Sequence, residues 1–323
     1  MKKFNNIVYV LNDRINESST TFLRAVSLAR INQADLTLMK IIPNMPAVIS
    51  SKLTSSSEKE LQNKVLAQEH AKLQTLIATL DAALDIKTAV KIGKKYIEVI
   101  RAVKAHKYDL LLKEVESIDW LERLFGSEDM HLLRKCPCPV LLMKKNDKSA
   151  YKNIMVAIDF DDDFDKYEYS YNDELNQKLL QCAISLSLSD FTTLHLVNVF
   201  DVPHSGYISL WADQPDKIEK ELFDTEYRNR QYKMNALLEA LKLNIGAELF
   251  EYLSPQTKIV QGVPSHQLPK LAEAINADLV IMGTVARSGI AGILIGNTAE
   301  NVLSQLQCSV LAIKPRDFIS PVS

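Results

Sequence analysis

Glycines gather in one stretch of the chain whose layout suits a phosphate group. The run GTVARSGIAGILIGN, from Gly283 to Asn297, holds four of the nine glycines in fifteen residues. It follows the apolar run ADLVIM and precedes TAENVLSQLQ, whose composition favours a helix. A strand, a flexible loop and a helix start together point backbone N–H groups and the helix dipole at an anion. The spacing therefore predicts a site for a phosphate-bearing ligand.

Other side chains that could bind a ligand or react give weaker indications of a functional site. The run DFDDDFDKYEYSYNDE, which begins at Asp159, holds eight acids and suits either a solvated loop or a divalent cation beside a bound phosphate. His266 is expected at an exposed helix start, with the ligand cleft as the alternative. No spacing indicates a Ser-His-Asp, Cys-His or zinc arrangement, so we predict no catalytic residue and no metal ligand. Weak ATPase activity stays open.

Composition narrows the class of protein. The 323 residues carry 38 basic and 40 acidic side chains, a balance unlike the basic footprint of nucleic-acid binders. The sequence contains no apolar run long enough for a membrane span or a signal peptide. The four cysteines are expected to be buried, reduced thiols, with CPCP structural, in a cytoplasmic protein.

The sequence repeats one plan twice. NNIVYVLND near the start returns as KNIMVAIDF, and Ile7 matches Ile154. DLTLMKII then corresponds to TLHLVNVF, and CPVLLMKK corresponds to CSVLAIKP. Because the order is the same in both halves, we expect two domains of one fold, at 1–147 and 150–323.

Each half alternates short β-branched runs with amphipathic stretches such as SSTTFLRAVSLARI and NQKLLQCAISLSL. This alternation predicts an α/β fold, with five strands per half in a parallel sheet covered by helices. The last strands, VLLMKK and VLAIKP, are apolar edges that are expected to pair with each other as an internal pseudo-dimer. A homodimer of the whole chain stays open. Ligands of such sheets lie beyond the carboxyl ends of the strands, where Gly283 and Asp159 are expected.

Four segments of the second half together resemble the universal stress protein family. They are a first strand ending in VAID, a G-x-P turn at Gly262 and Pro264, the segment DLVIMGTVARSGIAGILIGNTAENVL, and the final CSVLAIKP. The doubling is similar to the tandem type, and GNTAE to the E-type bacterial members. The resemblance implies two tandem five-stranded, Rossmann-like domains of the adenine nucleotide alpha hydrolase-like kind. It also implies a stress-response role and, in many members, binding of ATP or AMP with Mg²⁺.

The ATP loop of the family reads Gly, two residues, Gly, nine residues, Gly and then Ser or Thr. On this chain the four positions are Gly283, Ala286, Gly296 and Asn297. The methyl of Ala286 is expected to weaken or reshape the site, whereas Asn297 is a milder change because its amide can cap a helix or donate to phosphate. The ligand-binding residues that the resemblance implies, with the additions that we predict, are Asp159, Val197, Gly283, Ala286, Arg287, Gly296, Asn297 and Thr298.

The first half departs further from the family. Glu114 stands where Gly283 stands in the second half, and only Gly126 is retained, opposite Gly296. Trp120, Leu121 and Phe125 crowd the same segment. A carboxylate and bulky side chains repel and exclude a polyphosphate. We therefore predict a degenerate nucleotide site in this half.

Three classes of function follow. The first is a stress-response protein that binds a nucleotide or a phosphorylated small molecule in the second half. The second is a ligand-independent scaffold for partner proteins, whose identity the sequence does not indicate. The third is a binder of a larger nucleotide-linked metabolite, favoured if insertions leave an apolar chamber beside the loop.

Overall fold

A computed structural model describes most of the chain in two compact units. The described residues are 4–12, 19–50, 52, 54–80, 85–115, 128–145, 147–148, 150–160, 171–187, 192–202, 214–284 and 295–323. The N-terminal unit consists of Lys3–Ala150, Thr284–Ile295 and Ser309–Ser323. The C-terminal unit consists of Met1–Lys2, Tyr151–Gly283 and Gly296–Cys308. The last strand of the second half thus belongs to the N-terminal unit.

The N-terminal unit is built on a sheet of five parallel strands and one antiparallel strand. The parallel strands are β1 (Asn6–Val10), β2 (Asp35–Ile42), β3 (Ile86–Ile92), β4 (Leu110–Glu114) and β5 (Val140–Met143), in the order β3-β2-β1-β4-β5. β10 (Ser309–Ile313) pairs antiparallel with β5, with Leu311 opposite Leu141. This pairing confirms the expected internal pseudo-dimer.

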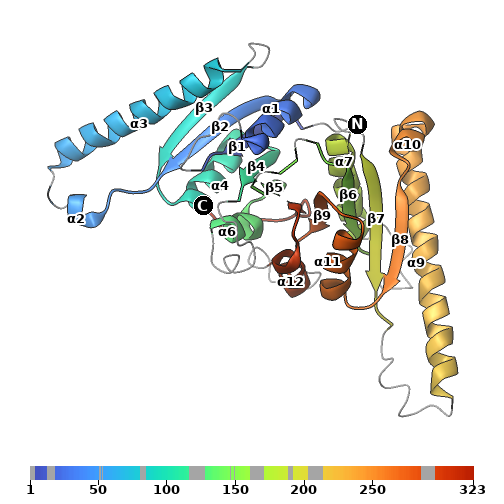
Figure 1. Cartoon of the computed structure of the whole chain (residues 1–323). Coiled ribbons are helices and arrows are strands. Elements are labelled where there is room, and N and C mark those ends of the chain that lie inside the picture. The colour runs from blue at the N-terminus through green and yellow to red at the C-terminus, as the bar shows by residue number, and fades with distance from the viewer. Residues whose placement is uncertain are drawn as a thin grey trace. The chain divides into compact units, whose positions relative to one another are not determined.

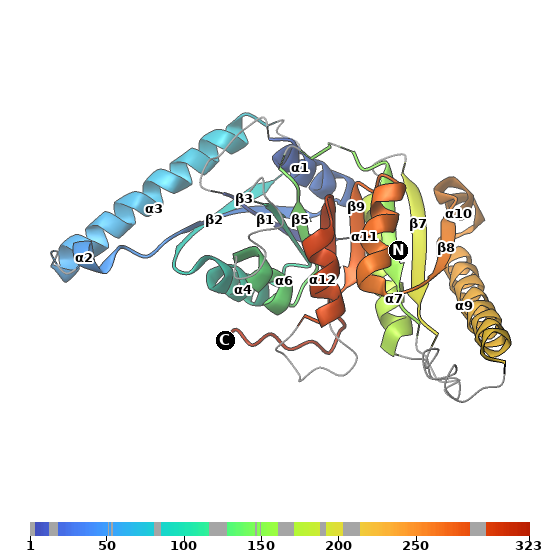
Figure 2. The ribbon, with the colours of Figure 1, turned by 60° about the horizontal axis from the view of Figure 1, so that its bottom comes forward.

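Helices cover both faces of this sheet. The described helices of this unit are α1 (Thr20–Asn32), α2 (Ala47–Ser50), α3 (Ser55–Ala78), α4 (Lys95–His106) and α6 (Glu128–Lys135), and of these α2 buries no side chain. α4 and α6 pack together on one face, and α1 lies on the other (Figure 2). Because both faces are covered, central strand residues such as Ile7, Leu36 and Leu111 are fully buried, as their apolar sequences predict.

The C-terminal unit contains the other four strands that the structure describes. They are β6 (Asn153–Ile158), β7 (Thr193–Phe200), β8 (Gln256–Gln261) and β9 (Leu279–Gly283), all parallel in the order β9-β6-β7-β8. The helices are α7 (Tyr171–Ser187), α9 (Pro215–Ile245), α10 (Ala247–Leu253), α11 (Pro264–Ala274) and α12 (Asn297–Gln305). α11 and α12 pack together, and α9 runs beside β8 (Figure 1). With β10 counted as its fifth strand, the second half has the predicted five.

The predicted turn at Gly262 joins β8 to α11 and requires glycine. Its φ is +135°, and a Cβ there would lie 2.7 Å from Nε2 of Gln267. Pro264 then begins α11, at a helix position where proline loses no hydrogen bond. The turn thus fixes where the chain leaves the carboxyl end of β8.

Two further expectations concern cysteines and membranes. Cys136, Cys138 and Cys182 are buried free thiols, as expected, whereas Cys308 is partly exposed. None of the described helices combines the length and the apolar character that crossing a membrane requires.

Candidate functional site

The carboxyl ends of three neighbouring strands of the C-terminal unit form the edge where a ligand was expected. β6 pairs with β7 on one side and with β9 on the other. Asp159 directly follows β6 and is exposed, and Gly283 ends β9. Both residues therefore lie at the predicted strand ends. Val197 is buried inside β7, paired with Ala157 and Lys258, and the strand continues to Phe200.

Two buried asparagines hold the chain where β6 ends. Asn176 of α7 donates from Nδ2 to the carbonyl of Asp159 over 2.7 Å, and its Oδ1 accepts the Asp159 N–H at 3.3 Å. Asn198 of β7 donates from Nδ2 to the carbonyl of Ile158 at 3.0 Å. The Oδ1 atom of Asn198 is buried and has no hydrogen-bond partner among the described residues. Together these contacts fix the backbone that presents Asp159.

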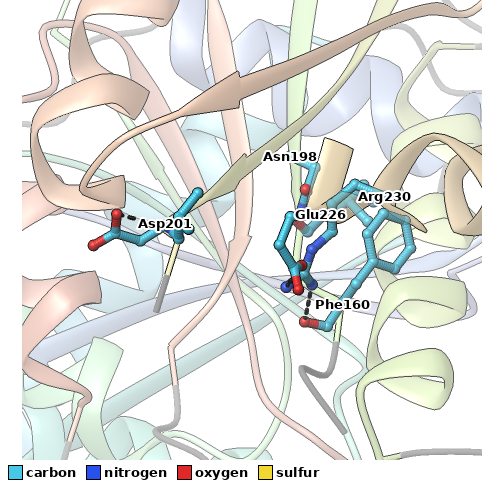
Figure 3. A network of polar contacts seen from close by, with 7 residues as sticks. Phe160, Asn198, Asp201, Glu226 and Arg230 are labelled. Atoms are coloured by element: carbon cyan, nitrogen blue, oxygen red, sulfur yellow. Dashed lines mark hydrogen bonds and ion pairs between the residues drawn. The ribbon is translucent and has the colours of Figure 1, made fainter. Parts of the chain in front are cut away.

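A buried ion pair from α9 reaches the same edge. Nη1 of Arg230 donates to the carbonyl of Phe160 at 2.8 Å, and Nη2 lies 3.4 Å from Oε2 of Glu226. Figure 3 shows Arg230, Glu226 and Phe160 together, with Asp201 set apart from them. The Arg230 side chain is only 4% exposed and its charge is balanced by Glu226, so it clamps the backbone after β6.

Aromatic side chains join the end of β7 to α9. The ring of Phe200 stacks on that of Phe223 at 5.8 Å between centroids, and Tyr227 lies 6.5 Å from Phe200. Offset contacts of this kind favour a fixed arrangement of the rings. α9 is therefore held over the end of β7 by packing as well as by Arg230.

Gly283 has a packing partner. A Cβ at this position would lie 2.8 Å from Cδ2 of Leu175 on α7, closer than real side chains approach. Glycine at 283 therefore allows α7 to pack against the end of β9. This steric requirement exists whether or not a ligand binds there.

The far end of the glycine-rich run begins α12. Gly296 is the N-cap residue, with φ −61° and ψ 142°, and it supplies no side-chain hydrogen bond to the helix. Asn297 and Thr298 form the first turn and are exposed. Ala286 and Arg287 lie outside the residues that the structure describes. His266 is exposed near the start of α11, as first expected.

The equivalent edge of the first half is occupied by its own side chains. Oε2 of Glu114 accepts hydrogen bonds from the hydroxyls of Thr21 at 2.5 Å and Ser19 at 3.1 Å. Thr21 also lies 3.1 Å from the hydroxyl of Tyr9, whose pKa burial raises to about 12. The Glu114 carboxylate thus bridges the end of β4 to the start of α1.

Acids also begin the first-half helix that corresponds to α12. Asp129 of α6 is paired with Nζ of Lys113 at 2.8 Å, and Glu128 accepts the Tyr96 N–H at 2.8 Å. Acids in the first helical turn satisfy the helix dipole and disfavour a further anion. Trp120, Leu121, Phe125 and Gly126 lie outside the described residues.

Sequence reasoning did not single out Asn176, Asn198, Glu226 or Arg230. Two signals were present. Asn198 is a polar residue inside the apolar run TLHLVNVF, and Glu226 and Arg230 have the i, i+4 spacing of a helical ion pair. Neither signal indicates which backbone group the side chain meets, because that depends on contacts between distant segments.

Comparisons with known proteins agree with this architecture. The family model "Universal stress protein family" matches residues 3–144 and 150–314. The Universal stress protein E homolog of Haemophilus influenzae is 32% identical over 97% of this chain and 98% of its own length. Among solved structures, a protein of unknown function from Pseudomonas aeruginosa has a TM-score of 0.66 at 22% identity, covering 97% of this chain and 94% of its own. A universal stress protein from Archaeoglobus fulgidus has a TM-score of 0.61 at 16% identity, covering 97% of both chains. The two structural matches bear on the fold alone.

Proposed function

Because the chain belongs to the universal stress protein family, we propose that it is a cytoplasmic stress-response protein that binds a nucleotide or another phosphate-bearing small molecule. The proposed site is in the second domain, 150–323, and the first domain, 1–147, holds no such ligand. ATP or AMP with Mg²⁺ is the proposed nucleotide. Binding is proposed rather than a reaction, because none of the described residues at these strand ends forms a catalytic arrangement, and weak ATPase activity stays an alternative.

One contrast between the halves carries this proposal. At the end of β4 the Glu114 carboxylate holds the hydroxyls of Ser19 and Thr21, in the space that follows the strand. At the end of β9 the corresponding residue is Gly283, which adds neither charge nor bulk. A polyphosphate is repelled by the first arrangement and tolerated by the second.

The two helix starts support the same conclusion. α6 begins with two acids, Glu128 and Asp129, whereas α12 begins with Asn297 and Thr298 after a glycine N-cap and has one first-turn acid, Glu300. The first two residues of α12 are therefore uncharged, and its N-terminus disfavours an anion less than that of α6 does. In the proposal, the N–H groups of Asn297 and Thr298 point at the phosphates. Arg287 adds a charge-assisted contact, and the methyl of Ala286 weakens binding relative to a glycine.

The remainder of the ligand is placed along the strand ends. Asp159 is exposed on backbone that Asn176 and Asn198 hold in place. A carboxylate there disfavours phosphate unless it faces a ribose hydroxyl or a bound cation. The base is proposed to lie near the end of the strand that contains Val197, where Phe200 and Asp201 follow it.

One observation favours a second candidate function. The contact between Gly283 and Leu175 accounts for this glycine by packing alone. In that case the glycine-rich run serves the fold, and the protein is a ligand-independent scaffold for other proteins. Such a protein would show no stabilisation by nucleotides.

A charge substitution at Gly296 separates the two candidates. Its φ of −61° suits any residue, so Gly296→Asp should fold and even cap α12. The matched control is Gly296→Asn, which has the same shape without the charge. At fixed Mg²⁺, we expect Gly296→Asp to weaken ATP binding at least about tenfold relative to Gly296→Asn, which corresponds to about 1.4 kcal/mol.

Calorimetric titration of both variants measures this difference, and thermal unfolding without ligand checks that both are folded. Equal affinities in the two variants would remove the start of α12 from the site. Absence of binding to the wild-type chain by ATP and by AMP would favour the scaffold.

A further inference from the structure

Two cysteines face each other between α6 and β5. Cys136 follows the last turn of α6, where its N–H donates to the carbonyl of Leu132 at 2.9 Å, and Cys138 precedes β5. Their Sγ atoms are 3.5 Å apart. Cys136 is completely buried and Cys138 is 8% exposed. The Cys-Pro-Cys segment therefore holds two buried thiols in contact, with only a small part of Cys138 at the surface.

The second half of the chain contributes a positive charge to this site. Lys314 follows β10 and is 1% exposed, and its Nζ donates to the carbonyl of Leu133 in the last turn of α6. β10 pairs with β5, so the strand pairing brings this ammonium group to the thiols. All these residues belong to the N-terminal unit.

The charge makes the two thiols unequal. Burial by itself raises the pKa of Cys136, but the hydrogen bond from Cys138 and the nearby Lys314 ammonium together lower it below the usual value. The hydrogen bond to Cys136, followed by burial, raises the pKa of Cys138 well above its usual value. Cys136 therefore loses its proton more readily than Cys138 does, and a thiolate is the nucleophilic form of cysteine.

We propose that Cys136 and Cys138 are a dithiol that hydroperoxides oxidise reversibly to a disulfide. The Cys136 thiolate attacks the peroxide oxygen, forming a sulfenic acid and releasing an alkoxide or hydroxide, which takes a proton from water. The Cys138 thiol then displaces the sulfenic oxygen as water and forms the S–S bond. In total, two thiols lose two electrons, and the hydroperoxide becomes an alcohol, or water, plus a second water.

The geometry requires only a local movement. The sulfur atoms must approach from 3.5 Å to the length of a disulfide, about 2.05 Å, and both belong to a segment of three residues. The second half offers an internal comparison. Cys308 corresponds to Cys138, but Leu306 stands in the place of Cys136, so Cys308 has no second cysteine two residues before it.

Peptide mapping of the full chain tests the proposal. Reduced protein is treated with hydrogen peroxide, denatured, alkylated and digested with trypsin, which releases residues 136–144 with both cysteines in one peptide. We expect this peptide to lose two hydrogen atoms and both alkylation sites, and to recover both after dithiothreitol. Oxidation of Met143 is distinguished because it adds oxygen. Cys182→Ser, which removes another buried thiol, should leave the reaction unchanged.

Variants of Lys314 test the role of the charge. Lys314→Met should slow disulfide formation roughly tenfold at neutral pH and reduce the ultraviolet absorbance of the thiolate, whereas Lys314→Arg should preserve both. A role of Lys314 confined to capping α6 would lower thermal stability without changing the thiolate signal. Both cysteines of the wild-type peptide remaining alkylated after peroxide, or gaining oxygen that dithiothreitol does not remove, would overturn the proposal.

Discussion

Gly283 has two possible reasons to be glycine, and they make different demands on a substitution. The steric reason is the side chain of Leu175, 2.8 Å from the position of a Cβ. The ligand reason is the approach of phosphate to the end of β9. Because the steric reason depends on the flexible side chain of Leu175, shortening that side chain should relieve the contact at position 283. The same change should not affect the approach of a phosphate to the end of β9.

We expect Gly283→Ala to lower the free energy of unfolding by about 1–3 kcal/mol, since it overpacks a close contact. In the double variant with Leu175→Ala the loss should be smaller than the sum of the two single losses. Urea unfolding of the four proteins measures this coupling. Additive losses would show that Leu175 is not what excludes a side chain at 283.

Asp159 and Gly283 could be placed from the sequence because a strand end follows from the apolar run before it. The residues that hold these ends could not. Asn176 meets the Asp159 backbone from 17 residues away, and Arg230 meets the Phe160 carbonyl from 70 residues away. Such partners depend on how helices pack on the sheet, which the periodicity of a single segment does not contain.

At the scale of elements, the end of β4 is fastened to the start of α1 through one carboxylate. Ser19 is the N-cap residue of α1, but its hydroxyl donates to Glu114 and accepts no backbone N–H of the helix. Thr21 makes the shorter bond to the same oxygen. The sequence predicted that Glu114 excludes a ligand. It did not indicate that Glu114 accepts hydrogen bonds from Ser19 and Thr21, because these residues lie more than ninety positions earlier in the chain.

Glu114→Ala should therefore lower the free energy of unfolding by about 1–3 kcal/mol, because two hydroxyls lose a charged acceptor. The control is Glu69→Ala, which removes an acid paired at 2.5 Å with the exposed Lys72 and should cost less than about 1 kcal/mol. Chemical denaturation of the two variants compares them directly. Equal, small effects would mean that Glu114 does not fasten α1.

At the scale of the whole molecule, the last strand of the chain completes the sheet that the first half begins. The repeat and the apolar ends VLLMKK and VLAIKP predicted that these strands pair, and β5 and β10 do so antiparallel. The sequence did not indicate that β10 joins the compact unit of the first half. A repeat defines equivalent strands, but not which half each strand packs with.

Cleavage at residue 149, through an inserted protease site, tests whether the first half needs β10 from the second half. The fragments should stay associated after cleavage. When separated in denaturant and refolded singly they should aggregate, because β5 then presents an unpaired apolar edge. Size-exclusion chromatography follows both steps. Two stable, monomeric fragments that do not interact would contradict the role given to β10.

The claim that one half binds and the other does not is tested most directly by the stoichiometry of nucleotide binding. Titration of ATP into the intact wild-type chain at fixed Mg²⁺, followed by calorimetry, should give one nucleotide per chain. Glu114, Glu128 and Asp129 are expected to exclude a nucleotide from the first half. The Glu114→Ala variant should still bind one, because the two acids at the start of α6 remain. A stoichiometry near two for the wild type, or no binding of either ATP or AMP, would contradict the account.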